Sequence, residues 1–246
     1  MMKNIIVYSI FFLLVVSSSL AAGEKFEKDT ISTSEGNLII TFIGHGTLMF
    51  EFKDKIIHVD PVSREANYKH MPQADLVLIT HEHGDHLDLD VLDMISNEDT
   101  KVIITETCKK RGAEGTVMHN GDTIEMCGLT IKAVPAYNIV HKRSSGEPYH
   151  PQGVGNGYVV DFADKRVYIA ADTENIPEME NLENIDIAFL PMNLPYTMSP
   201  EMAADAAKKF YPQILYPYHY GRTNTDELVK LLEDVEEIEV RIRDMQ

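Results

Sequence analysis

The sequence predicts a single domain of the mixed α/β (α+β) class, and two patterns support that prediction. The first is a meander of short apolar segments joined by tight polar turns over residues 37–59. The second is an alternation of strand-like and helical segments over residues 75–134, which is typical of a sheet with helices on one face. With 246 residues, of which 44% are hydrophobic, the chain is long enough to bury the core of such a domain.

The first half of the chain is expected to supply one sheet. The run Asp75–Ile79 is short, apolar and partly β-branched, so it is predicted to be a buried strand. Asp60-Pro61 ends the preceding strand, because proline cannot donate to a ladder. Asp88 is expected to cap a helix over residues 89–95. Residues 23–36 are expected to be a polar lead-in. The other predicted strands are residues 37–43, 48–52, 56–59, 101–105, 116–119, 122–126 and 129–134, with a short helix at 106–111.

The second half is expected to add another set of strands and two helices. Ser199-Pro200-Glu201 has the features of a helix start, with serine as the cap, proline at the first helical position and an acid in the first turn. A second helix is predicted at residues 225–235 from its amphipathic pattern. The predicted strands are residues 158–162, 166–170, 185–190, 213–218 and 237–242.

Residues 1–22 have the composition of a secretory signal peptide, so the predicted domain spans residues 23–246. Lys3 gives a positive start, residues 5–16 form an apolar core too short to span a bilayer comfortably, and Ser19-x-Ala21 fits a cleavage site. The protein is therefore expected to be exported to the periplasm or secreted, with no stable membrane insertion after cleavage. An uncleaved membrane anchor is the alternative.

The charge of the chain disfavours nucleic acid as a partner and leaves a small molecule as the expected substrate. The formal net charge is −17, and basic residues cluster only at residues 109–111 and 142–143, whereas phosphate backbones are bound by basic surfaces. Cys108 and Cys127 are the only cysteines. The sequence leaves open whether they form a disulfide, and it does not give the oligomeric state.

A group of metal-ligand residues follows the predicted strand Asp75–Ile79. His81 and His83 point to the same side of an extended segment, so both imidazoles can reach one ion. Gly84 permits a sharp turn, which would direct Asp85 and His86 toward a second ion. Imidazole and carboxylate together suit zinc first, then iron or manganese.

This His-x-His-x-Asp-His pattern after a buried strand resembles that of the metallo-β-lactamase superfamily. The resemblance spans residues 37–221 and implies a four-layer αββα sandwich that holds one or two metal ions. The flavodiiron branch typically carries glutamate at the position of His83, so the histidine favours the zinc hydrolase branch. The corner Gly44-His45-Gly46-Thr47 and the turn Asp60-Pro61 are similar to the branch that contains L-ascorbate-6-phosphate lactonase and N-acylphosphatidylethanolamine phospholipase D.

The resemblance also implies ligands from later in the chain. Asp172, in an Ala-Asp-Thr setting after an apolar strand, matches the bridging carboxylate of the family, and His219 matches its last ligand. In the register where many relatives carry histidine, this chain has Asn138. His150 or His141 is expected to replace that ligand. His150 is favoured because a proline and a glycine-rich approach follow it, whereas His141 lies in a polar loop.

The implied site uses two divalent ions, with Zn²⁺ expected and Mn²⁺ or Fe²⁺ as alternatives. Two such ions lower the pKa of a bridging water, so the implied reaction is attack of a metal-activated hydroxide on an ester, lactone or phosphodiester bond of a small substrate. Asp85 is the expected proton carrier, and His45 is expected beside the pocket as a catalytic group that does not bind metal. The implied metal ligands are His81, His83, Asp85, His86, His150, Asp172 and His219, and the expected substrate-binding residues are Asn193, Tyr196 and His141.

Two alternatives to a hydrolase remain open. A metal-binding protein without turnover would result if the departure at Asn138 means that a ligand is missing. An iron-dependent oxidoreductase on the same fold is the other, although His83 argues against it. The substrate itself cannot be identified from the sequence.

Overall fold

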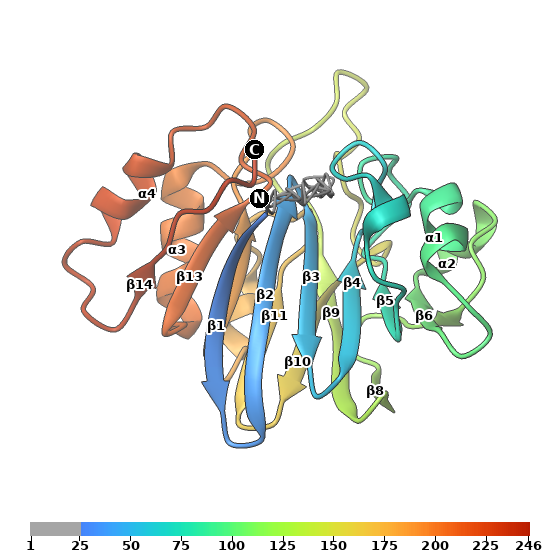
Figure 1. Cartoon of the computed structure of the whole chain (residues 1–246). Helices are drawn as coiled ribbons and strands as arrows, with labels where there is room; N and C mark the ends of the chain where they lie inside the picture. Colours follow the sequence, from blue (N-terminus) through green and yellow to red (C-terminus); the bar gives the residue numbers. More distant parts are fainter. Residues whose placement is uncertain (1–25) are drawn as a thin grey trace, which may run out of the picture.

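The chain forms two seven-stranded sheets packed face to face in the computed structural model, which describes residues 26–246 (Figure 1). The predicted signal peptide lies outside the described residues. The first sheet has the order β1-β2-β3-β4-β5-β6-β7. Its strands are β1 (Glu27–Thr33), β2 (Gly36–Gly44), β3 (Thr47–Phe52), β4 (Lys55–Val59), β5 (Leu76–Leu78), β6 (Lys101–Ile104) and β7 (Thr116–Val117).

The second sheet repeats the pattern of the first. Its order is β14-β13-β12-β11-β10-β9-β8. In each sheet the first four strands in chain order pair antiparallel and the next three are added in parallel. The strands are β8 (Thr123–Met126), β9 (Leu129–Ala136), β10 (Gly155–Phe162), β11 (Lys165–Ile169), β12 (Ile187–Pro191), β13 (Ile214–Tyr218) and β14 (Glu239–Val240).

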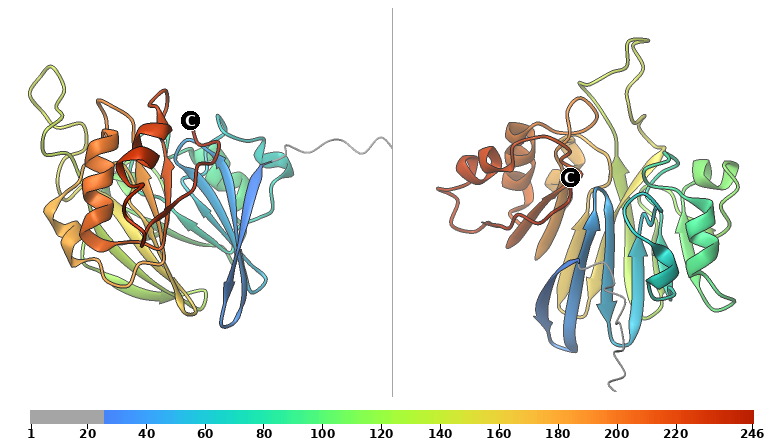
Figure 2. Two further views of the ribbon diagram at one scale, coloured as in Figure 1. Left: turned by 90° about the vertical axis from the view of Figure 1, so that its left-hand side faces the viewer. Right: turned by 45° about the horizontal axis from the view of Figure 1, so that its top comes forward.

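Helices cover the outer faces of both sheets, which gives the four-layer sandwich that the sequence predicts (Figure 2). Helices α1 (Leu89–Ile95) and α2 (Glu106–Lys110) pack on the first sheet through a core that includes Val77, Ile104 and Cys108. Helices α3 (Pro200–Phe210) and α4 (Thr225–Leu231) lie beside the second sheet. Two short 3-10 helices, η1 (Tyr68–His70) and η2 (Pro177–Asn181), lie in the connections.

The main core lies between the two sheets and is rich in aromatic rings. Phe50 of β3 packs against Phe162 of β10 and Phe189 of β12, with ring centroids 5.5 and 6.0 Å apart. Phe189 also stacks on Tyr216 at 5.2 Å. Burial of these rings fixes how the sheets lie on each other, so the loops at the strand ends are held in a defined relation.

The element predictions hold for most of the chain, and the departures have physical reasons. Asp88 caps α1 and Ser199 caps α3, each by accepting a hydrogen bond from the backbone, as predicted. The polar lead-in is wrong: residues 27–33 form the edge strand β1, whose mostly polar side chains gave no apolar alternation. Strand β10 begins at Gly155 rather than residue 158, because the glycine-rich approach is itself paired with β9.

Two further features concern the described part of the chain. Cys108 and Cys127 are both free thiols, the first buried on α2 and the second partly buried after β8. Among residues 26–246, none of the helices has the length and apolar character needed to cross a bilayer.

Candidate metal centre

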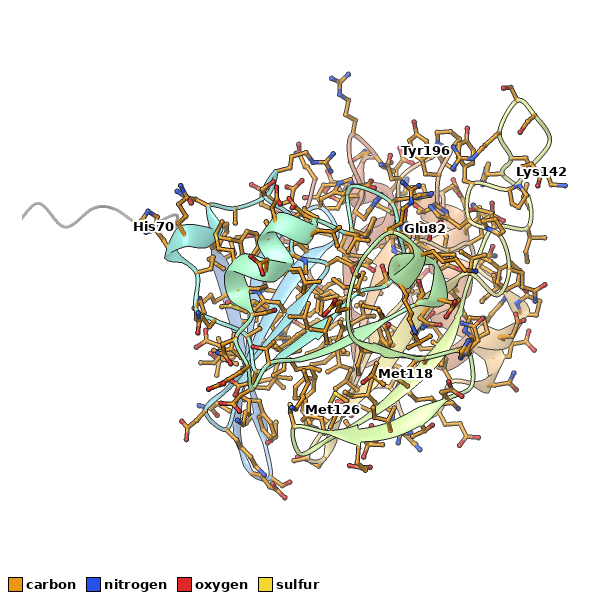
Figure 3. The ribbon with its side chains drawn as sticks, turned by 90° about the vertical axis from the view of Figure 1, so that its right-hand side faces the viewer. His70, Glu82, Met118, Met126, Lys142 and Tyr196 are labelled. Carbon is orange, nitrogen blue, oxygen red and sulfur yellow. The ribbon has the colours of Figure 1, made fainter. Side chains whose placement is uncertain are left out.

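Histidine and aspartate side chains from both sheets meet at one end of the sandwich. The contributing segments follow β2, β5, β11 and β13, together with the long connection from β9 to β10. Glu82, which lies between two of the histidines in the chain, marks this end of the molecule in Figure 3. Because β5, β11 and β13 run into their loops at this end, residues far apart in the sequence converge there.

The first group of side chains is His81, His83 and His150. One ring nitrogen from each lies within 4.8 Å of the others, and His81 Nε2 is 3.1 Å from His83 Nδ1. His81 and His150 are buried. Burial lowers the pKa of His81 well below its ordinary value, so this imidazole stays neutral, which is the form that binds metal.

Asp172 lies between the first group and a second one. Its Oδ2 atom is 3.2 Å from His150 Nε2, while its Oδ1 atom is 3.4 Å from both His86 Nε2 and His219 Nε2. Burial raises its pKa, but His219, His86 and His150 outweigh burial and hold it well below its ordinary value. The carboxylate therefore directs one oxygen to each group, as a bridging ligand must.

The second group gathers around Asp85 and His219. His219 Nε2 is 3.9 Å from Asp85 Oδ2, and His45 Nε2 is 3.5 Å from the same oxygen. Burial raises the pKa of Asp85, but His219 and His45 outweigh it and keep this carboxyl ionised. His45 is thus closer to the centre than a residue merely beside the pocket.

Hydrogen bonds from outside the cluster orient the rings. Asp60 accepts from His86 Nδ1 at 2.8 Å and from both the backbone and the hydroxyl of Thr80. The Thr80 hydroxyl in turn lies 3.0 Å from His81 Nδ1. Because Nδ1 is occupied in His81 and His86, their Nε2 atoms remain free to face the centre. Asp60 therefore holds the start of the histidine-rich loop and one of its rings in place.

Several polar atoms inside the cluster have no hydrogen-bond partner among the described residues. They include His86 Nε2, Asp172 Oδ1, His219 Nε2 and His45 Nε2. Unsatisfied buried polar atoms are costly, so their convergence needs a ligand. Burial lowers the pKa of His86, but the carboxylates of Asp172 and Asp60 outweigh it and raise the pKa to about 9. Neutral imidazoles and carboxylates at these separations fit divalent metal ions.

The two candidate replacement ligands, His150 and His141, have different surroundings. His150 faces the cluster, and its Nδ1 atom donates to Asn138 Oδ1 at 2.7 Å. Asn138, in the register where relatives carry a ligand, therefore supports the histidine that stands in for it. His141 is 25% exposed and lies against Glu174, with its Nδ1 atom 2.7 Å from the carboxylate.

Glu174 is a residue that the sequence analysis did not single out. Its fully buried carboxylate accepts hydrogen bonds from the backbone N–H groups of Ile139, Val140 and His141 and from the side chain of Asn138. It thereby holds the start of the long connection in place. An acid directly after Ala-Asp-Thr at the end of a strand was the available signal.

The expected substrate-binding residues lie at the rim. Tyr196 is 46% exposed, its ring packs edge-on against Tyr149 at 5.1 Å, and its carbonyl accepts from the Asn138 side chain. Tyr196 and Lys142 lie at the same end of the molecule as Glu82 (Figure 3). Asn193 is half-buried against Gly221. The rim therefore offers a polar amide and an exposed ring close to the cluster.

The chain is similar to known metal-dependent hydrolases along most of its length. Residues 39–219 match a family model described as the beta-lactamase superfamily domain. A metal-dependent hydrolase of Pelotomaculum thermopropionicum is 31% identical over 194 residues, which are 74% of this chain and 84% of the relative. The crystal structure of a candidate metal-dependent hydrolase from Parabacteroides distasonis is 50% identical, with a TM-score of 0.86, and the match covers 90% of this chain and 100% of that one.

A more distant structure has the same fold. CmlA, a diiron beta-hydroxylase from Streptomyces venezuelae, is 17% identical with a TM-score of 0.67, and the match covers 87% of this chain and 54% of that one. At this level of identity the likeness concerns the fold alone.

Proposed function

This chain belongs to the β-lactamase superfamily, as its histidine motif predicts, and we propose that it is a hydrolase that holds two divalent metal ions. The observation that carries the proposal is the position of Asp172, whose two oxygens face two separate groups of nitrogen ligands. A single ion would need only one of these groups. The names of the relatives support hydrolysis but give no substrate.

The residues of the cluster would divide between two metal positions. His81, His83 and His150 would hold the first ion, Asp85, His86 and His219 the second, and Asp172 would bridge them. When bound, such ions acidify a water molecule and polarise a carbonyl or phosphoryl oxygen of the substrate. The chemistry suits an ester, a lactone or a phosphodiester. Zinc is the first choice for the ligand set, with manganese and iron as alternatives.

The chain's own groups would position the reactants and move the proton. Asp85 is one-third exposed, so it reaches both the centre and solvent. It would orient the attacking water and accept its proton for transfer to the leaving group. Tyr196 and Asn193 would contact the substrate at the rim, and His141 can reach it only if its bond to Glu174 opens. The net charge of −17 favours a substrate other than nucleic acid.

The test replaces the proposed bridge. Asp172→Ala should lose at least one of two bound ions, and hydrolysis should fall by at least about a hundredfold, because both positions lose a charged ligand. Metal content would be measured by elemental analysis. Activity would be measured on a lactone, a phosphodiester, a carboxylic ester and a β-lactam.

The matched control is Asp93→Ala, which removes an exposed aspartate on α1. It should keep both ions and full activity. If Asp172→Ala keeps full activity, Asp172 is not the bridge. If the intact protein binds two ions but turns over none of the four substrates, a binding protein without turnover is favoured. Strong visible absorption of the isolated protein together with oxygen uptake would instead favour an iron oxidoreductase, which the CmlA fold also accommodates.

A further inference from the structure

The corner between β2 and β3 holds one histidine directly against the second metal position. The His45 carbonyl accepts a hydrogen bond from the backbone of His219 at 2.9 Å, and the two rings pack with centroids 3.7 Å apart. His45 Nδ1 lies 3.2 Å from the main-chain oxygen of Gln246. The end of the chain, marked C in Figure 1, lies over this corner. Three contacts thus fix the direction in which the ring points.

The glycines on either side allow the corner to approach the centre. A Cβ atom on Gly46 would lie 2.8 Å from His86 Cε1, so any larger residue would collide with another imidazole of the cluster. Gly44 has a φ of +147°, and a Cβ atom there would lie 2.7 Å from Glu65 Oε2. The motif Gly-His-Gly therefore serves to bring a histidine close to the centre.

The distance between His45 Nε2 and the nearest carboxylate oxygen of Asp85 is the distance expected between two ligand atoms of one ion. Two donors that each bind an ion at about 2.1 Å lie roughly 3.0–3.5 Å apart at octahedral or tetrahedral angles. His45 Nε2 is 3.5 Å from Asp85 Oδ2, which is long for a hydrogen bond. The proposed ligands show the same spacing, because His86 Nε2 and His219 Nε2 both lie 3.4 Å from Asp172 Oδ1.

His45 also shares the arrangement of the other histidines. In His81, His86 and His150 an oxygen outside the cluster lies against Nδ1, and Nε2 faces inward. In His45 the main-chain oxygen of Gln246 lies against Nδ1, and Nε2 is buried with no hydrogen-bond partner among the described residues. This main-chain oxygen acts as an acceptor, so Nδ1 carries the proton and Nε2 presents a free lone pair.

We propose that His45 is a fifth protein ligand at the second metal position, together with Asp85, His86, Asp172 and His219. This inference rests on the proposed two-ion function. The first position would offer four protein donors, His81, His83, His150 and Asp172, a donor set that suits zinc. Five donors exceed a tetrahedral shell and favour an ion that accepts six ligands, such as Mn²⁺, Fe²⁺, Co²⁺ or Ni²⁺. The two positions therefore differ in their number of protein ligands, and the second accommodates a six-coordinate ion more readily than the first.

Cobalt titration of metal-free protein tests whether His45 is a ligand, and it needs no substrate. The intact protein should bind two Co²⁺ ions, and the second equivalent should add only the weak visible absorption of high-coordinate cobalt. In His45→Ala the second ion should bind at least about tenfold more weakly, and its absorption should rise as the coordination number falls. Paramagnetic proton spectra should also lose one shifted imidazole N–H signal, because a ligating ring is lost.

His119→Ala is the matched control, since His119 is an exposed histidine that pairs with Asp122 and belongs to none of the histidine and aspartate groups of the centre. It should leave the affinity, the absorption and the shifted signals unchanged. His45→Gln replaces His45→Ala if the alanine variant does not fold. Two bound ions with an unchanged spectrum and an unchanged count of shifted signals in the His45 variant would show that His45 only positions Asp85. Binding of a single ion by the intact protein would overturn the two-ion function itself.

Discussion

At the scale of residues, several positions of the centre have backbone conformations that residues other than glycine rarely adopt. His45, Asp60, Ala171 and His219 all have left-handed backbone angles, with φ of 50°, 44°, 59° and 48°. Each such residue costs about 1–3 kcal/mol and persists only where its surroundings hold it. Ala171, for example, donates its backbone N–H to the hydroxyl of Tyr218 at 2.9 Å. These turns direct the side chains at the strand ends into the centre.

Asn138 provides a test of how the substitute ligand is held. Its Oδ1 atom accepts from both the backbone and Nδ1 of His150, and its amide nitrogen donates to Glu174. Asn138→Ala should weaken metal binding at the first position by about 10–100-fold, because the His150 ring loses its orientation. Isothermal titration of metal-free protein would measure the affinity.

The control for this change is Asn37→Ala, an exposed asparagine on β2, which should bind metal as the intact protein does. Equal affinities of the two variants would mean that Pro151 and the surrounding loop orient His150 without help from Asn138.

At the scale of elements, the sequence predicts the features that depend on neighbouring residues. It does not predict contacts between residues that are far apart in the chain. The motif after β5 was recognisable because His81 and His86 lie on one short segment. The residues around His150 favoured it over His141. The hydrogen bond that holds its ring was not predicted, because its acceptor, Asn138, lies at the other end of a loop. Glu174 was missed for the same cause, since its partners lie more than thirty residues away. The Gly-His-Gly corner indicated that His45 lies beside the pocket, but its close packing against the ring of His219 involves a residue far along the chain and could not be predicted.

Strand β4 carries a buried histidine away from the centre that should make stability depend on pH. Burial lowers the pKa of His58 to about 4, although its bond to the Pro72 carbonyl acts the other way. An unfolded histidine has a pKa near 6.5. Between that pH and pH 4 the unfolded state therefore binds a proton that the folded state does not bind. The contribution of His58 to the free energy of unfolding is therefore full above pH 6.5 and falls as the pH drops toward 4, by about 3 kcal/mol.

Urea unfolding of metal-free protein between pH 7 and pH 4 would measure this effect. His58→Leu removes the titrating group. The free energy of unfolding of the intact protein should therefore fall by about 3 kcal/mol more than that of the variant over this pH range. The use of metal-free protein keeps metal release out of the comparison. Parallel curves for the two proteins would show that His58 does not change its protonation on unfolding.

At the scale of the whole molecule, the edges of the two sheets are joined where the described chain begins and ends. Asp29 of β1 accepts two hydrogen bonds from Arg243 Nη2 at 2.7 Å and one from the hydroxyl of Tyr216 on β13. The segment after Arg243 continues to Met245, whose N–H donates to the Tyr220 hydroxyl, and then to the main-chain oxygen that faces His45. The first strand of one sheet therefore helps to hold the segment that reaches the metal centre.

This link should contribute to stability only while Asp29 is ionised. Partial burial raises its pKa, but Arg243, Tyr216 and Arg241 outweigh burial and lower it below the ordinary value of 3.8. A lowered pKa means that the stabilisation is present above about pH 4 and is lost as the pH falls through the pKa of the folded state. Asp29→Asn should therefore be less stable than the intact protein by about 1 kcal/mol at pH 7, and the difference should be smaller at pH 3. Asp93→Asn, on the exposed face of α1, should show no difference at either pH. A deficit that stayed constant down to pH 3 would assign the effect of Asp29 to packing rather than to its charge.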